Sequence, residues 1–190
     1  MFNLIDTDFS GFLRLERWQK PGSKHTMLVV RTTDSVSGLL YDPANDRVCL
    51  VRQNRAPMVR DDNTEGLIVE LIAGRFDRVV GAKALFVAEA KEEAGANIME
   101  ADVTLLNEGR PLAPSPGVLT ERCILAFAEI REDQLDPGET FGVAAENERT
   151  HRVWMSTQEF LIGPHDDLRV YALARELECR LLRRPQHLGR

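Results

Sequence analysis

The first part of the chain has the short apolar runs and turn residues that are typical of β-strands. Apolar and polar side chains alternate loosely over residues 11–34, with a break at residues 20–23 (Lys-Pro-Gly-Ser), which predicts a hairpin or two short strands. Apolar runs at 35–41 and 47–52 flank the turn-forming sequence Asp-Pro-Ala-Asn-Asp, so we predict a second hairpin there. A polar loop separates this hairpin from a short apolar strand expected at residues 66–72.

The second part of the chain mixes strands with helices. Residues 82–94 are rich in alanine and lack glycine and proline up to Gly95, which predicts a helix that ends at that glycine. Residues 167–184 are amphipathic and predict another helix. The acidic residues 131–145 are expected to form a long loop. Further strands are expected at residues 103–106, 122–130 and 150–156.

This order of elements predicts the fold class. Strands before and after one central helix, with another helix at the end, favour an α+β domain in which a sheet lies between helices. A chain of 190 residues is long enough for one domain with a substantial core or a domain plus a small appendage. We expect a small N-terminal β segment at residues 1–34 and one main domain at residues 35–190.

The amino-acid composition indicates which binding partners and which cellular compartment to expect. The chain is 43% hydrophobic and 28% charged, as is ordinary for a globular protein. Its formal net charge of -6 argues against non-specific binding to nucleic acid or to an anionic membrane. Three scattered cysteines fit a reducing compartment. No apolar run reaches the length of a signal peptide or of a membrane span, so we expect a cytoplasmic protein.

The predicted helix at residues 82–94 carries a cluster of acids. Glu89, Glu92 and Glu93 are spaced three and four residues apart and therefore share one helix face. Carboxylates this close repel one another, and a hard divalent cation such as Mg²⁺ would compensate them. A solvated acidic face is the simpler interpretation of such a run in isolation. Here the face follows a strand, an Ala-Gly turn and a loop, and this setting favours a site.

Gly74 and this helix together resemble the Nudix box. That pattern is a glycine, five residues, a glutamate, seven residues and then Arg-Glu-apolar-x-Glu-Glu-x-Gly-apolar. Gly74 takes the first position, and the following residues occur at the right spacing: Glu89, Ala90, Glu92, Glu93, Gly95 and Ala96. Val80 stands in place of the first glutamate and Ala88 in place of the arginine, two residues that chiefly orient the box in the family.

The resemblance extends beyond the box to the ADP-ribose pyrophosphatase branch of the Nudix family. It covers residues 28–185, nearly the whole chain, and separated motifs in the right order are more specific than any single one. The additional motifs are the strand pair at 40–43 and 48–55, the Glu-x-Pro-Ala-Gly sequence at 70–74 with Ile72 in place of the proline, the Ser-Pro-Gly loop at 115–117 with Thr-Glu-Arg at 120–122, and the acidic loop at 145–148.

The resemblance implies roles for the acidic residues. Glu89 and Glu93 are expected to bind Mg²⁺, or Mn²⁺, with support from Glu92 and with the main-chain carbonyl of Ala73 as a further ligand. Such ions would neutralise a diphosphate and activate water. The family places its catalytic base on the late acidic loop, where Glu146 matches that position. Glu148 is the nearby alternative.

The resemblance also implies substrate-binding residues. Arg55 is the expected phosphate clamp, because a guanidinium donates paired hydrogen bonds to phosphate oxygens. Glu121 follows the Ser-Pro-Gly loop and is expected to contact substrate or metal. Gly117 is expected to allow a close backbone approach. Glu70 is expected to pair with an arginine and shape the site.

The implied activity is hydrolysis of a nucleoside diphosphate sugar. ADP-ribose, which would yield AMP and ribose 5-phosphate, is the favoured substrate, and GDP-mannose or another sugar nucleotide is the close alternative. A non-catalytic Nudix-fold regulator that binds a nucleotide sugar is a second interpretation, and a plain α+β binding domain with an acidic surface helix is a third. The resemblance also implies a homodimer, joined through residues 13–31.

Overall fold

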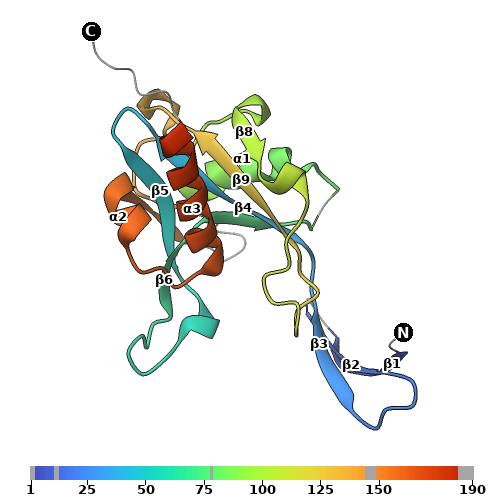
Figure 1. The fold of residues 1–190 in the computed structure, drawn as a ribbon. Helices are drawn as coiled ribbons and strands as arrows, with labels where there is room; N and C mark the ends of the chain where they lie inside the picture. Colours follow the sequence, from blue (N-terminus) through green and yellow to red (C-terminus); the bar gives the residue numbers. More distant parts are fainter. Residues whose placement is uncertain (1–2, 11–12, 78, 144–148, 184–190) are drawn as a thin grey trace.

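The computed structural model describes residues 3–10, 13–77, 79–143 and 149–183. Within these ranges the chain forms a small N-terminal sheet and a larger mixed sheet with helices on both faces (Figure 1). The α+β class expected from the sequence is therefore confirmed. No helix in the described ranges has both the length and the apolar character needed to cross a membrane.

The N-terminal sheet contains three antiparallel strands, β1 (Asn3–Ser10), β2 (Arg14–Gln19) and β3 (Thr26–Arg31), in that spatial order. It projects away from the rest of the chain (Figure 1). The two strands predicted on either side of the break at residues 20–23 are confirmed, and β1 is an additional strand. The edge of β3 is held to the main body, since Val30 N–H donates to the carbonyl of Val118 at 2.8 Å.

A fork between two strands organises the larger sheet. The predicted hairpin of β4 (Ser35–Asp42) and β5 (Arg47–Asn54) pairs only near its turn. Beyond that point, β6 (Leu67–Glu70) pairs with β5 and β7 (Ile72–Arg75) pairs with β4. The single strand expected at residues 66–72 is therefore two strands, because this segment crosses from one arm of the fork to the other at the buried Leu71.

The remaining strands complete a mixed sheet. The strand β9 (Cys123–Glu129) runs parallel to β4, and β8 (Val103–Leu105) runs antiparallel to β9. The strand β11 (Thr150–Ser156) pairs with β5, and β10 (Thr140–Phe141) with β11. All three strands predicted in this part are confirmed, while the loop expected at 131–145 also holds β10 and a short 3-10 helix.

Helices cover both faces of the larger sheet (Figure 1). On one face lies α1 (Ala82–Ala94), and on the other lie α2 (Thr157–Ile162) and α3 (Leu168–Arg183). The helix α1 ends as predicted at Gly95, whose φ of 62° is the left-handed C-cap conformation. The short 3-10 helices are η1 (Ala56–Met58), η2 (Glu100–Asp102), η3 (Asn107–Gly109) and η4 (Glu132–Gln134).

Alternating side chains of β4 supply two apolar cores. Val36 and Leu40 belong to the core beneath α1, whereas Leu39 and Tyr41 belong to the core beneath α2 and α3. This is the side-chain alternation expected of a strand that is covered on both faces. Gly38 lies on the α1 side of β4, where an added Cβ would stand 2.4 Å from the ring of Phe86.

We predict that Gly38→Ala lowers the free energy of unfolding by about 1–3 kcal/mol, since the new methyl group must displace a fully buried aromatic ring. Urea denaturation measures this change. Adding Phe86→Leu should recover part of the loss. Gly117→Ala is the control, because an added Cβ at Gly117 meets nothing within 4 Å. An unchanged unfolding midpoint in Gly38→Ala would contradict the packing described here.

Candidate functional site

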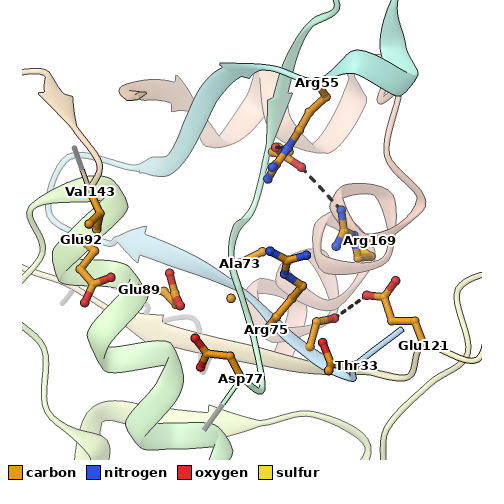
Figure 2. Close-up of a pocket in the computed structure, with 13 residues that line it drawn as sticks. Thr33, Arg55, Ala73, Arg75, Asp77, Glu89, Glu92, Glu121, Val143 and Arg169 are labelled. Atoms are coloured by element: carbon orange, nitrogen blue, oxygen red, sulfur yellow. Dashed lines mark hydrogen bonds and ion pairs between the residues drawn. The ribbon is translucent and has the colours of Figure 1, made fainter. Parts of the chain in front are cut away.

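A cleft of about 720 Å³ opens where β7 passes between α1 and the start of α3 (Figure 2). Its lining brings together segments that are far apart in the sequence. The lining residues are Thr33, Ser35, Arg55, Glu70, Ala73, Gly74, Arg75, Asp77, Glu89, Glu92, Glu121, Val143 and Arg169. Six of the predicted site residues therefore share this one cavity: Arg55, Glu70, Ala73, Glu89, Glu92 and Glu121.

One side of the cleft carries carboxylates. Glu89 and Glu92 project from α1, and Asp77 lies just beyond β7 on the same side (Figure 2). Glu89 lies directly over Gly74, where an added Cβ would be 2.0 Å from its Oε1 atom. A side chain at Gly74 would therefore occupy the space that the Glu89 carboxylate fills.

Glu93 has a different setting from the other two glutamates. It is 1% exposed and is not part of the cleft lining as far as the chain is described. Its Oε2 atom accepts a hydrogen bond from the Ala73 N–H at 2.9 Å, and its main-chain carbonyl accepts one from Thr150 Oγ1 at 2.7 Å. Glu93 thus joins α1 to β7 and to β11, and its predicted role as a metal ligand stays a prediction.

The donor atoms on the carboxylate side are of the kind that Mg²⁺ binds. They are carboxylate oxygens of Glu89 and Glu92 and the nearby backbone of Ala73. Among the described residues, no group of three or more His, Cys, Asp or Glu side chains lies close enough together to hold a metal ion by itself. Two carboxylates and a main-chain oxygen are donors that Mg²⁺ accepts when water and substrate phosphate complete its coordination.

The other side of the cleft carries Arg55, Arg75 and Arg169 (Figure 2). Arg55 follows β5, and its Nε–H donates to Glu70 Oε1 at 2.7 Å. Glu70 is buried, and its second carboxylate oxygen lies 3.6 Å from a terminal nitrogen of Arg169. The prediction that Glu70 pairs with an arginine is confirmed. Its carboxylate contacts two arginines, Arg55 and Arg169.

Arg169 is itself fixed by Asp167 at the start of α3. The Nε atom of Arg169 lies 3.1 Å from Oδ1 and 3.0 Å from Oδ2 of Asp167. Burial alone would raise the pKa of Asp167, but the hydrogen bonds and charge of Arg169 lower that pKa below its ordinary value. Burial acts to lower the pKa of Arg169, and Asp167 outweighs it, so the pKa of Arg169 is raised. Both groups are therefore charged at neutral pH.

The remaining predicted site residues lie in two places. Glu121 lines the cleft, and its Oε1 accepts a hydrogen bond from Ser35 Oγ at 2.6 Å. Gly117 is not part of the lining within the described residues. Glu146 and Glu148 lie outside the residues that the structure describes, so the choice of catalytic base stays a prediction.

Three charged lining residues were not expected from the sequence: Arg75, Asp77 and Arg169. The alternation of side chains along a strand could have indicated Arg75, because Arg75 is two residues from Ala73 and so lies on the same face of β7. Asp77 continues the same spacing beyond the strand. Nothing local indicates Arg169, which reaches the cleft only because α3 packs across the sheet.

Comparison with models of known protein families and with curated proteins finds no match in either set. The resemblance to the Nudix family therefore rests on the motifs quoted above.

We predict that Gly74→Ala displaces the Glu89 carboxylate and weakens Mn²⁺ or Mg²⁺ binding at least about tenfold, measured by titration calorimetry. The unfolding free energy should change by less than about 1 kcal/mol, because a flexible side chain can move aside more easily than a buried ring. In a Glu89→Gln background, adding Gly74→Ala should cause no further loss. Equal metal affinity in Gly74→Ala and the unaltered protein would count against this contact.

Proposed function

We propose that the chain is a Nudix-fold, Mg²⁺-dependent hydrolase that cleaves the diphosphate linkage of a nucleoside diphosphate sugar. One observation carries this proposal. The acids of the Nudix-like segment, Glu89 and Glu92, face Arg55 across a single cleft. A site with hard cation ligands on one side and guanidinium groups on the other is suited to an anionic substrate that also binds metal.

The metal would be held by Glu89, Glu92 and the main-chain oxygen of Ala73, together with Glu93 as the resemblance implies. When bound, Mg²⁺ would neutralise charge on the diphosphate and lower the pKa of a water molecule. The position of the acids adds support, because Glu92 and Glu93 lie in the last turn of α1. Carboxylates there are repelled by the negative end of the helix dipole. A bound cation would reduce this repulsion.

The arginine side would bind the diphosphate. Because Nε of Arg55 is used by Glu70, the terminal nitrogens of Arg55 are the donors that can meet phosphate oxygens. Arg75 adds positive charge on the same side of the cleft (Figure 2). Glu121 and Ser35, joined by a hydrogen bond, would contact the ribose or sugar hydroxyls at the edge of the cleft.

The proposed reaction is hydrolysis of one bond between phosphorus and the bridging oxygen of the diphosphate. A water oxygen bonds to one phosphorus, the bond from that phosphorus to the bridging oxygen breaks, and the water proton is taken up by a base. Glu146 is the proposed base, with Glu148 as the alternative. ADP-ribose would yield AMP and ribose 5-phosphate, and GDP-mannose or another sugar nucleotide remains the alternative substrate.

A second candidate function is nucleotide-sugar binding without hydrolysis. Val80 favours it, since this residue stands where the family pattern has a glutamate and packs against the apolar core beneath α1. Its side chain therefore adds no carboxylate to the cleft. Asp77 supplies one from a neighbouring position, which favours hydrolysis over simple binding.

The test is a panel of ADP-ribose, GDP-mannose and other sugar nucleotides with Mg²⁺. Alkaline phosphatase releases phosphate from the monoester products and not from the intact diphosphates. We predict Mg²⁺-dependent phosphate release that EDTA abolishes, and that Glu89→Gln lowers kcat by about 100-fold or more because a metal ligand is lost. Release of no phosphate from any member of the panel, with substrate binding retained, would favour the non-catalytic alternative.

In the same assay, Glu93→Gln tests whether Glu93 binds the metal or only joins α1 to β7. An amide oxygen still accepts the Ala73 N–H, so the unfolding midpoint should change little, while a metal ligand would be weakened. Turnover equal to that of the unaltered protein would show that Glu93 acts only as a link between α1 and β7. Glu100→Gln, which removes an exposed acid outside the cleft, controls for the change in net charge.

We further propose that the N-terminal sheet joins two copies of the chain. Met27 and Leu28 on β3 are 44% and 52% exposed, on a sheet that projects from the main body (Figure 1). Exposed apolar side chains on a projecting strand are suited to an interface. Light scattering should give the mass of a dimer for the unaltered chain and of a monomer for Met27→Ser/Leu28→Ser. A monomeric unaltered chain would refute the dimer.

A further inference from the structure

Four charged side chains form a line from the start of α3 to the cleft. Their signs alternate, from Asp167 to Arg169, then Glu70 and finally Arg55. Their side chains are 11%, 27%, 4% and 41% exposed in that order. The most exposed member is thus Arg55, and the other three, of which Glu70 and Arg169 also line the cleft, are more buried. Buried charges of this kind are stable only when each is paired.

The hydrogen bond between Glu70 and Arg55, the last contact in this line, orients the Arg55 side chain. Its backbone is already fixed, since the Arg55 N–H donates to the Gly66 carbonyl at 2.7 Å, and an added Cβ on Gly66 would lie 2.4 Å from the Arg55 carbonyl oxygen. The side chain is held through Nε by Glu70 at 2.7 Å. A guanidinium held by Nε keeps its planar fork in one orientation and presents its terminal nitrogens outward.

The first link joins this line to the folding of α3. Asp167 Oδ1 accepts the Arg169 main-chain N–H at 2.7 Å, as the N-cap of a helix does. The same carboxylate is shared with the Arg169 side chain. The Arg169 side chain also reaches Ser37 on β4, donating to its Oγ at 3.2 Å. The helix start and the position of Arg169 against Glu70 therefore depend on the same carboxylate.

We propose that Asp167 and Arg169 are positioning residues for Arg55, acting through the Glu70 carboxylate. Without Arg169, the Glu70 carboxylate would lose one of its two cationic partners and would hold Arg55 less firmly. Without the Asp167 charge, Arg169 would turn from Glu70 toward solvent. The consequence for binding rests on the proposed function, in which Arg55 grips a diphosphate. The arrangement links the C-terminal helix to substrate affinity.

The variant Asp167→Asn tests the negative charge of Asp167 separately from its role as a helix cap. Asparagine is as good an N-cap as aspartate, so α3 keeps its start while the ion pair to Arg169 is lost. Asp166→Asn is the matched control, because it makes the same change at the neighbouring exposed position. Thermal unfolding of both variants shows whether the fold is retained.

The direct readout is hydrogen exchange at the Arg55 side chain. In ¹H–¹⁵N spectra of the substrate-free protein, the Arg55 Nε–H should exchange about fivefold or more faster in Asp167→Asn than in Asp166→Asn, since a weakened charge-assisted hydrogen bond opens more often. Glu70→Gln should have at least as large an effect. In a Glu70→Gln background, adding Asp167→Asn should change the exchange rate no further.

The kinetic readout uses ADP-ribose and Mg²⁺. Asp167→Asn should raise KM about 3- to 10-fold with kcat altered less than twofold, because a binding group is loosened while the carboxylate side is untouched. General damage to the fold would instead lower kcat and the unfolding temperature together, and this result would overturn the inference. So would Arg55 exchange in Asp167→Asn equal to that of the control. Absence of hydrolysis in the unaltered protein would refute the proposed function alone, because the exchange measurement needs no substrate.

Discussion

The close contact between α1 and β7 is the constraint on which the cleft depends. The buried Glu93 carboxylate accepts the Ala73 N–H, and the absence of a side chain at Gly74 leaves room for the Glu89 carboxylate between the helix and the strand. This contact places Glu89 over the strand and turns Glu92 toward the cleft. A bulkier strand, or a helix without the buried acid, would separate the carboxylates from the backbone that completes their side of the site.

The two sides of the cleft are held rigid by different means. The carboxylates stand on a regular helix whose end is closed by a left-handed glycine, so their mutual repulsion cannot be relieved by moving the backbone. Arg55 and Arg169 have long, flexible side chains that are oriented by the buried Glu70 and the half-buried Asp167. Such pairing satisfies buried charge and fixes direction at once.

Much of the fold follows from local pattern. The helix at 82–94 and the strand at 150–156 have the predicted bounds, because helix propensity, a glycine stop and an apolar run act over a few neighbouring residues. The split of residues 67–75 into two strands does not follow from pattern, since it depends on where β4 and β5 diverge. The short α2 was missed although Ser156 and Glu159 form a capping box, which is a local signal.

The sequence by itself determined that Glu89, Glu92 and Glu93 are neighbours on one helix and which glycine precedes them, because residues three and four apart on a helix are neighbours whatever surrounds them. Family-like motifs also pointed to Arg55, Glu70 and Glu121, which the structure brings into one cleft. Only the tertiary structure decided that Glu93 turns inward while Glu89 and Glu92 line the cleft, and that Arg169 arrives from α3. Burial and long-range ion pairs depend on how distant segments pack, and no local pattern of residues specifies that packing.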